Sequence, residues 1–251
     1  MPLTGFPFVI LEQVDSTNNY AMAKVHAGMA KHGHAWFSDH QTAGKGQRGK
    51  VWVTGAGQNI ALSITLNPKK MNIRYPFQLT LITALAGYDL FSRYAGDETT
   101  IKWPNDIYWR DRKAGGILIE NKYSGNLWKW AVVGIGLNVN EKEFAEGAGN
   151  AVSLRQITGK MYDPATLAAE LYELIMKRGN ELLTKSCEAL LEEYNHHLYK
   201  MKQSVRLKKD NIVFETLIRG VSPQGQLVTM DVIERQFDFG EVEWVIAKSE
   251  N

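Results

Sequence analysis

The pattern of apolar residues changes at about residue 203, and this change limits the possible folds. Before it, apolar residues occur both in short extended runs, such as Ile60–Leu66, and at helical spacing, as over 76–94. After it, only short runs separated by turn residues are found. We therefore predict an α+β fold over residues 1–200, with a mostly antiparallel mixed sheet flanked by helices, and a small β domain over residues 201–251.

Within the first part, alternating apolar runs and turn residues predict seven strands and three helical segments. The strands are expected at 8–14, 35–39, 60–66, 99–103, 107–109, 116–123 and 128–135. A cap at Asp15–Asn18 begins a helix that runs to about Ala30, and a second helix covers 76–94. Asp163 and Pro164 start a long helical segment, which Gly179 is expected to bend or split. Residues 113–115 and 124–126 are assigned to turns between strands.

Composition places the chain among ordinary globular proteins. Of its 251 residues, 44% are hydrophobic and 22% are charged, which excludes disordered and collagen-like chains. The apolar stretches are far shorter than the roughly 20 residues that a membrane helix needs. One cysteine, Cys187, forms no internal disulfide, and Met1–Leu11 has no signal-peptide pattern. We expect a cytoplasmic protein without a membrane partner.

A basic, glycine-rich loop over Gly44–Gly49 is the first candidate site. It matches G-x-G-x-x-G, but an extended segment follows it, and no acidic residue occurs between Asp39 and Asp89, so a dinucleotide site is disfavoured. Backbone N–H groups with Lys45 and Arg48 suit a phosphate or a carboxylate. Trp52 then offers a stacking surface for a flat base, although a core tryptophan is the more common case.

Two further runs carry polar residues at structural turns. Pro104 fixes a turn that presents Asn105 and Asp106 together, either to hold a ribose or a metal–phosphate group or as an ordinary Asx turn. Lys113 stands next to two glycines that permit close backbone approach, although it is equally compatible with a solvated turn lysine. The glycines within 134–138 suggest that a ligand or another backbone lies close to that strand.

Taken together, these motifs resemble the biotin–protein ligase family, also described as biotin–[acetyl-CoA-carboxylase] ligases. The resemblance rests on five runs in the order and spacing of the family. They are 15–18, 41–49 followed by Trp52, 102–106, 113–120 and 134–138. It covers about residues 8–140, with a looser match of Gly240–Val242 to the small SH3-like domain of the family. The resemblance implies a class II synthetase-like catalytic domain over 1–200 and an SH3-like domain over 201–251.

The resemblance also implies the chemistry. Biotin and Mg-ATP would give biotinyl-5′-AMP and pyrophosphate, and biotin would then pass to a lysine of a biotin carboxyl carrier protein. Such attack on the α-phosphorus needs no protein nucleophile, only positioning and fixed positive charge. Relatives occur as monomers and as dimers joined through the sheet, so a homodimer is one expected state. The catalytic strand begins by about Phe8, so we expect the monofunctional form without a DNA-binding domain, and no sequence-specific DNA binding.

Roles follow from the resemblance residue by residue. The biotin site would comprise Ser16, Thr17, Asn18, Gln41, Gly44, Lys45, Gly46, Gln47, Lys113 and Gly116. The ATP site would comprise Arg48, Trp52, Asn105, Asp106, Lys113 and Asn138, with Asp106 also near magnesium. Lys113, Arg48 and Lys45 would act in catalysis.

The loop departs from the common family pattern at two positions. Many relatives have Gly-Arg-Gly-Arg-x-Gly, where this chain has Lys45 and Gln47. Lysine cannot make the forked contact of arginine, and glutamine has no charge, so we expect looser retention of the adenylate.

Two alternatives stay open at the level of sequence. One is a lipoate– or octanoate–protein ligase of the same fold, whose linear substrate has less need of the polar residues Ser16–Asn18 and Gln41. The other is a non-catalytic protein. It would be either a module that binds a nucleotide or a nucleic acid through the basic loop, or a homologue that only holds biotin, against which the presence of Lys113 and Arg48 argues.

Overall fold

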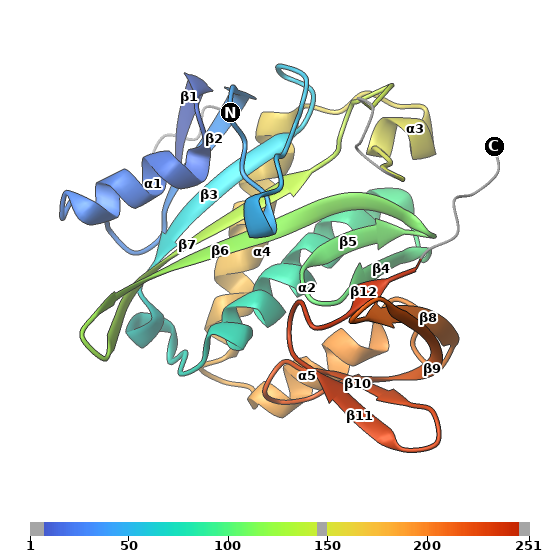
Figure 1. The fold of residues 1–251 in the computed structure, drawn as a ribbon. Coiled ribbons are helices and arrows are strands. Elements are labelled where there is room, and N and C mark those ends of the chain that lie inside the picture. Colours follow the sequence, from blue (N-terminus) through green and yellow to red (C-terminus); the bar gives the residue numbers. More distant parts are fainter. Residues whose placement is uncertain (1–7, 145–149, 246–251) are drawn as a thin grey trace.

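The computed structural model describes residues 8–144 and 150–245. Its larger part is a seven-stranded sheet in which only β1 and β2 run parallel (Figure 1). The spatial order is β1 (Phe8–Val14), β2 (His34–Gln41), β3 (Ile60–Leu66), β7 (Leu127–Leu137), β6 (Arg112–Ser124), β5 (Asp106–Trp109) and β4 (Thr99–Lys102). The expected mostly antiparallel mixed sheet is thereby confirmed.

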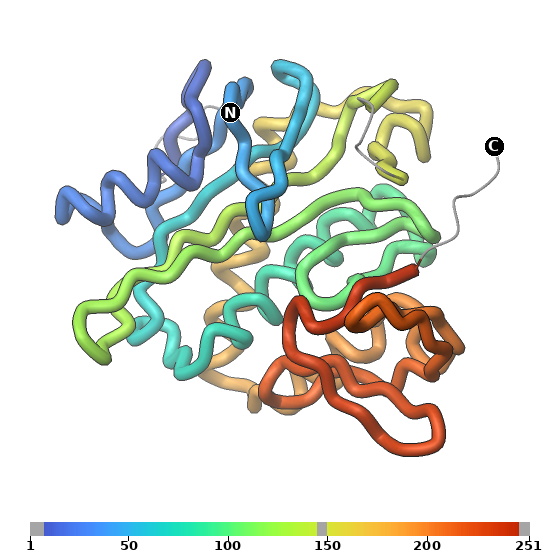
Figure 2. The backbone as a smooth tube through the Cα atoms, in the orientation of Figure 1, coloured from blue at the N-terminus to red at the C-terminus, as the bar shows by residue number. Residues whose placement is uncertain are grey.

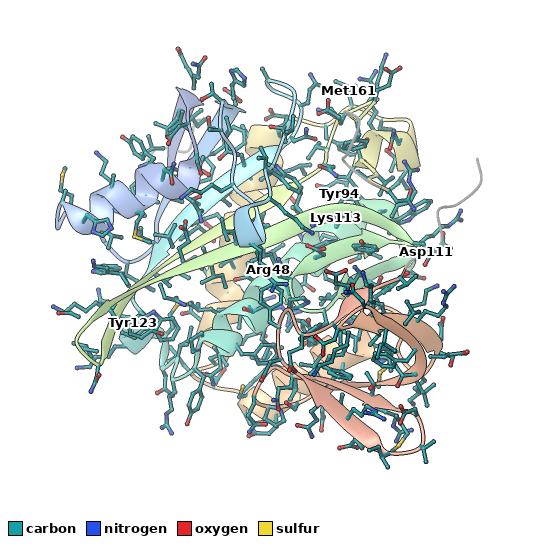
Figure 3. The ribbon with its side chains drawn as sticks, in the orientation of Figure 1. Arg48, Tyr94, Asp111, Lys113, Tyr123 and Met161 are labelled. Atoms are coloured by element: carbon teal, nitrogen blue, oxygen red, sulfur yellow. The ribbon has the colours of Figure 1, made fainter. Side chains whose placement is uncertain are left out.

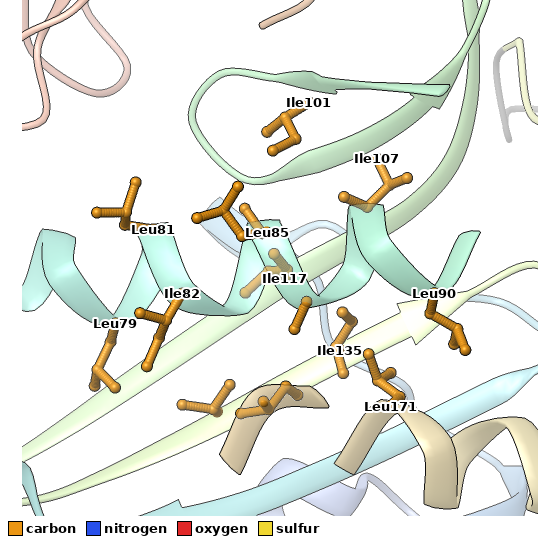
Figure 4. Close-up of a cluster of buried hydrophobic side chains, with 14 of the residues drawn as sticks. Leu79, Leu81, Ile82, Leu85, Leu90, Ile101, Ile107, Ile117, Ile135 and Leu171 are labelled. Carbon is orange, nitrogen blue, oxygen red and sulfur yellow. The ribbon is translucent and has the colours of Figure 1, made fainter. Parts of the chain in front are cut away.

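The two faces of the sheet are covered differently. One face packs on α2 (Pro76–Ala95) and α4 (Pro164–Glu181), and Figure 4 shows Leu85 of α2 among Ile107, Ile117 and Ile135 of the sheet. Successive strand residues point to opposite faces, so Trp36 and Val132 lie on the other side, against α1 (Thr17–His26). Because α1 packs on β2, β3 and β7, the part of this face over β6, β5 and β4 is left for other segments.

The C-terminal strands form a second sheet beside the β4 edge of the first (Figure 1). Its order is β11 (Glu234–Phe237), β10 (Leu227–Met230), β9 (Ile212–Val221), β8 (Ser204–Lys209) and β12 (Glu243–Trp244), and every pairing is antiparallel. Helix α5 (Cys187–His196) precedes it and contacts β9. This small β domain confirms the second half of the predicted fold class. None of the described helices is long and apolar enough to cross a membrane.

Several boundaries differ from the predicted ones. Residues 113–115 form no turn, because β6 already begins at Arg112 and the turn lies at Arg110 and Asp111. Helix α1 ends at His26, whereas the sequence predicted an end at about Ala30. Two residues after this end, Gly28 adopts a left-handed φ of 69°. The long helical segment breaks after Glu181, not at Gly179. A Cβ at Gly179 would lie 1.8 Å from Met71 Cε, so the end of the buried Met71 side chain occupies the space that this glycine leaves.

Short elements were missing from the sequence prediction. They are α3 (Leu154–Thr158) and the 3₁₀ turns η1 (Gln47–Gly49) and η2 (Pro68–Met71). Each spans five residues or fewer, so its apolar positions cannot show a helical period.

Candidate functional site

A row of small and charged residues crosses the open face of the sheet. Neighbouring strands pair residue by residue along this row, which places the side chains on one face. The row consists of Ala61 in β3, Gly136 in β7, Gly116 in β6, Asp106 in β5 and Lys102 in β4. The two glycines leave a hollow in the middle of the sheet, and charged groups follow it towards the β4 edge.

A cavity of about 1070 Å³ lies over this row. It is bounded by the start of α1, the segment between β2 and β3, and the C-terminal strands; Figure 2 shows that segment passing in front of the sheet. Every site residue predicted from the sequence lines the cavity except Gly44, which borders a neighbouring hollow. Figure 3 labels Arg48 and Lys113, both lining residues, over the middle of the sheet. Residues from 16 to 138 are thus brought together, as the resemblance implies.

One end of the cavity is a hydrogen-bonded polar cluster. Gln41 Oε1 accepts from the Thr17 backbone N–H at 2.8 Å and from the Thr17 hydroxyl at 3.1 Å. The hydroxyl of Ser63, on β3, lies 2.7 Å from Thr17 Oγ1 and 2.6 Å from Asn18 Oδ1. An amide oxygen can only accept, so Ser63 donates to Asn18. Ser16 is the N-cap residue of α1, and its side chain makes no capping hydrogen bond within the described residues. The cluster is therefore a fixed set of donors and acceptors.

Gly134 explains how Asn18 reaches this position. A Cβ at residue 134 would lie 2.2 Å from Asn18 Oδ1, so only glycine leaves room for the amide. The sequence predicted a ligand or a backbone close to this strand, whereas the neighbour of Gly134 is a side chain. Asn18 Nδ2 donates to Glu120 Oε2 at 2.9 Å, which fixes the orientation of the amide.

The basic loop crosses from this polar end towards the C-terminal domain. Lys45 pairs with the other oxygen of Glu120, with 3.6 Å between Nζ and Oε1. Gln47 Nε2 donates to the Ile117 carbonyl at 3.2 Å, which holds the loop over β6. Arg48 has a φ of 55°, and its guanidinium lies 5.7 Å from the centre of the Phe239 ring. Cations therefore line the cavity from both ends of the loop.

Trp52 lies directly over the hollow of the row. A Cβ at Gly136 would come within 2.5 Å of Trp52 Cε2, so the glycine provides the space for the indole. Gly44 is packed equally closely, since its Cβ would meet the Trp52 carbonyl oxygen at 2.3 Å. Trp52 Nε1 is buried and has no hydrogen-bond partner within residues 8–144 and 150–245. Gly136 therefore leaves the space for the indole, and Gly44 leaves the space for the main chain of Trp52.

Lys113 and Asp106 meet above the centre of the row. Lys113 Nζ lies 2.7 Å from Asp106 Oδ1, and a Cβ at Gly116 would be 3.3 Å from each of these two atoms. Asn105 Nδ2 donates to the Ile117 carbonyl at 2.7 Å, and Asn138 Nδ2 donates to the Lys113 carbonyl at 3.3 Å. The ammonium of Lys113 is thus directed into the cavity by an anionic partner on the adjacent strand.

Lys102 is a further cation that lines the cavity, and no role was predicted for it. Its Nζ lies 4.9 Å from the centre of the Tyr108 ring and 5.4 Å from the Trp244 ring. Burial lowers the pKa of the Lys102 ammonium to about 8; Asp106 acts against this shift, and Lys113 and Lys50 act with it. Ser63, Phe239 and Trp244 were missed as well. Ser63 could have been noticed as a hydroxyl within an apolar strand, but the C-terminal aromatics reach the site only through tertiary folding.

A metal ion would find few protein ligands here. Across residues 8–144 and 150–245, no group of three His, Cys, Asp or Glu side chains is arranged to hold one. Asp106 is a single carboxylate and already pairs with Lys113. Magnesium commonly binds through one or two carboxylates together with substrate phosphates, so the donor set fits an ion that arrives with a nucleotide.

Comparisons with known proteins identify the family of this chain. Residues 10–138 match the model of the biotin/lipoate A/B protein ligase family. The bifunctional ligase/repressor BirA of Bacillus spizizenii is 28% identical over 223 residues, covering 88% of this chain and 68% of that protein. The biotin–[acetyl-CoA-carboxylase] ligase of Paracoccus denitrificans is 37% identical over 162 residues, which cover 62% of this chain and 65% of that ligase.

A solved structure extends the likeness over nearly the whole chain. The biotin protein ligase of Aquifex aeolicus, in complex with biotin and ATP, superposes with a TM-score of 0.80 at 25% identity. The alignment covers 96% of this chain and 99% of that one. By contrast, the chain spans between about half and two thirds of the length of the BirA proteins that it matches.

Proposed function

Because this chain belongs to the biotin/lipoate A/B protein ligase family, we propose that it is an ATP-dependent biotin–protein ligase. The observation that carries this proposal is the polar cluster of Thr17, Asn18, Gln41 and Ser63 at one end of a cavity whose other walls carry Lys113, Arg48 and Lys45. One end suits a neutral, hydrogen-bonding head group, and the rest suits anions.

The polar end fits the ureido ring of biotin. This ring has two N–H donors and one carbonyl acceptor, and each needs a partner when it is buried. Ser16, Thr17, Asn18 and Gln41 provide hydroxyl and amide groups there, and Ala61, Leu62 and Ile135 provide apolar wall. A linear acyl chain has no group that would use this cluster, so the cluster favours biotin over lipoate or octanoate.

The cations fit the adenylation step. A carboxylate oxygen of biotin would attack the α-phosphorus of ATP, and the bond from that phosphorus to the bridging oxygen of pyrophosphate would break. Two anions must approach for this to occur, and Lys45 and Lys113 would offset their charge. Lys45 would have to leave Glu120 to contact the substrate carboxylate. The free energy lost in this step is small, because the present ion pair is partly exposed and its atoms lie 3.6 Å apart. Trp52 and Asn138 would hold the adenine, and Asn105 and Asp106 the remaining nucleotide.

Magnesium would enter with ATP and neutralise phosphate charge, with Asp106 as the protein carboxylate closest to Lys113. Asp106 would serve the ion after releasing Lys113 to the phosphates. Both groups would remain paired with an opposite charge in this exchange, Asp106 with magnesium and Lys113 with the phosphates.

The second step passes biotin to a carrier protein. The amine of a carrier lysine would attack the acyl carbon of the adenylate, lose a proton, and release AMP. Lys113 would remain beside the departing phosphate, where negative charge increases as the acyl–oxygen bond breaks. The partner that this chemistry requires is a biotin carboxyl carrier protein.

The direct test is transfer to a purified carrier domain, followed by intact mass spectrometry. We expect a mass increase with biotin and ATP, and none with lipoate or octanoate. A carrier whose acceptor lysine is replaced by arginine is the control and should stay unmodified. Modification by lipoate or octanoate alone would refute the substrate assignment, and no modification with any acid would refute the ligase assignment.

A further inference from the structure

The row of residues across the sheet continues one strand beyond the catalytic pair. Lys102 in β4 is paired with Asp106 in β5, which is paired with Gly116 in β6. Adjacent strands are about 4.8 Å apart, so the Lys102 position lies roughly 10 Å from Gly116 along the sheet. Lys102 also lines the same cavity as Lys113. A third cation therefore stands on the floor, on the side towards the C-terminal domain.

The ammonium of Lys102 is held by aromatic rings instead of a carboxylate. Tyr108 is on β5, whereas Trp244 belongs to β12 of the C-terminal domain, so the box closes only when the two domains pack together. Tyr199 packs against both rings, with centroids 5.2 Å from Tyr108 and 5.5 Å from Trp244. No salt bridge of Lys102 is found within the described residues, and Asp106, the acidic group that acts on Lys102, is paired with Lys113.

The order of the reacting groups along the sheet indicates which anion Lys102 would bind. On the proposed function, the biotin end of the cavity lies at Ser63 and Gly134, on β3 and β7. Lys113 and Asp106 lie over β6 and β5, where the α-phosphate would be. In phosphoryl transfer the attacking and leaving oxygens lie roughly in line on opposite sides of the phosphorus. The leaving group would therefore depart towards β4, where Lys102 stands.

The charges around this end also suit a polyphosphate. Lys50, Lys102 and Lys113 line the cavity there, against the carboxylates of Asp106 and Glu243. Asp106 is already paired with Lys113, which leaves a positive excess. Pyrophosphate carries several negative charges, whereas the biotin carboxylate and the α-phosphate carry one each.

We propose that Lys102 binds the pyrophosphate that leaves ATP, in a subsite between β4 and the C-terminal strand β12. This role rests on the proposed function and adds a residue to its first step. As the bond from the α-phosphorus to the bridging oxygen breaks, the electron pair stays on that oxygen. Lys102 offsets the charge that accumulates on the pyrophosphate, and no proton needs to move.

The test separates the two half-reactions in the full-length enzyme. In the Lys102→Met variant, we expect the KM for ATP in adenylate formation, and the inhibition constant for added pyrophosphate, to rise about 10- to 100-fold, as for loss of a charge-assisted hydrogen bond. Transfer of biotin from supplied biotinyl-5′-AMP to the carrier should stay within twofold, because pyrophosphate has already left. Lys102→Arg should restore much of the pyrophosphate inhibition. Lys129→Met, on the exposed β7 hairpin, is the matched control and should change neither step.

Three results would overturn the assignment. Equal loss of both half-reactions in Lys102→Met would show that the lysine only supports the fold. Unchanged inhibition by pyrophosphate would show that it does not touch the leaving group. The third result is that Lys102→Met still transfers biotin but Lys102→Arg does not restore inhibition by pyrophosphate. It would show that the positive charge at this position does not bind pyrophosphate. By contrast, a wild-type enzyme that forms no adenylate from biotin would refute the proposed function itself.

Discussion

Ser63 should control biotin affinity although it stands within an apolar strand. Its hydroxyl is fully buried and lies 2.7 Å from Thr17 Oγ1 and 2.6 Å from Asn18 Oδ1. The Ser63→Ala change leaves the Asn18 oxygen without this donor in a buried place, at a cost of about 1–3 kcal/mol. We expect the free energy of unfolding to fall by an amount within this range and, separately, the dissociation constant for biotin to rise about tenfold, corresponding to roughly 1.4 kcal/mol.

A matched control lies on the same strand. Thr65 is on the same face of β3, is also fully buried, and donates its hydroxyl to the Lys31 carbonyl at 2.8 Å instead of to the polar cluster. Thr65→Val removes one buried hydroxyl as Ser63→Ala does, so both should lower the free energy of unfolding by a similar amount. Titration calorimetry with biotin, together with urea unfolding, measures the two effects. Biotin affinity within twofold of wild type in Ser63→Ala, or an equal loss in Thr65→Val, would refute the assignment of the polar cluster.

Three other outcomes are expected. Gln47→Arg adds a cation where Gln47 now bonds the Ile117 carbonyl, so release of the adenylate should slow several-fold in a chase experiment; an unchanged rate would contradict it. The pKa of Lys102 is about 8 in the folded protein and 10.5 in the unfolded chain, so the folded state binds fewer protons between these values. The unfolding free energy of the ligand-free protein, relative to Lys102→Met, should therefore rise by about 2 kcal/mol from pH 7 to 10, and a flat difference would exclude the shift. Arg178→Met strands the carboxylates of Asp89 and Glu193, which its guanidinium now bonds at 2.6–2.9 Å, and should lower the unfolding free energy by about 3 kcal/mol in chemical denaturation, whereas a loss below 1 kcal/mol would contradict that.

The strands were predictable because each is a short apolar run that ends at turn residues. Ile60–Leu66 and Phe8–Val14 have the predicted bounds, and the helix predicted over 76–94 differs by one residue at its end. The turn predicted at Lys113–Gly115 was wrong, because a lysine with two glycines close behind it is also typical of a turn. Gly115 is required for a different reason: a Cβ there would lie 2.7 Å from the Gly136 carbonyl oxygen on β7. Such an approach between strands distant in sequence leaves no local signal.

In the candidate site, too, the residues in local motifs were predictable, whereas contacts between distant segments were not. Ser16–Asn18 and the basic loop were found because motif order and spacing identify them, and the structure places them on one cavity. Lys102 belongs to the run 102–106, but one of the two rings beside its ammonium is Trp244, which is 142 positions further along the chain. Arg48 likewise contacts Phe239 and donates to the Gly240 carbonyl at 3.4 Å. Contacts between the two domains depend on how β12 pairs with β8, which periodicity within either segment does not determine.

Exchange of labelled pyrophosphate into ATP tests the central claim most directly, because it reports adenylate formation without any carrier protein. The reaction should be run in parallel with biotin, lipoate and octanoate. We expect exchange with biotin, and none above background with the other two acids. Exchange with lipoate or octanoate but not with biotin would contradict the substrate and leave the fold assignment intact, and no exchange with any of the three would contradict the ligase itself.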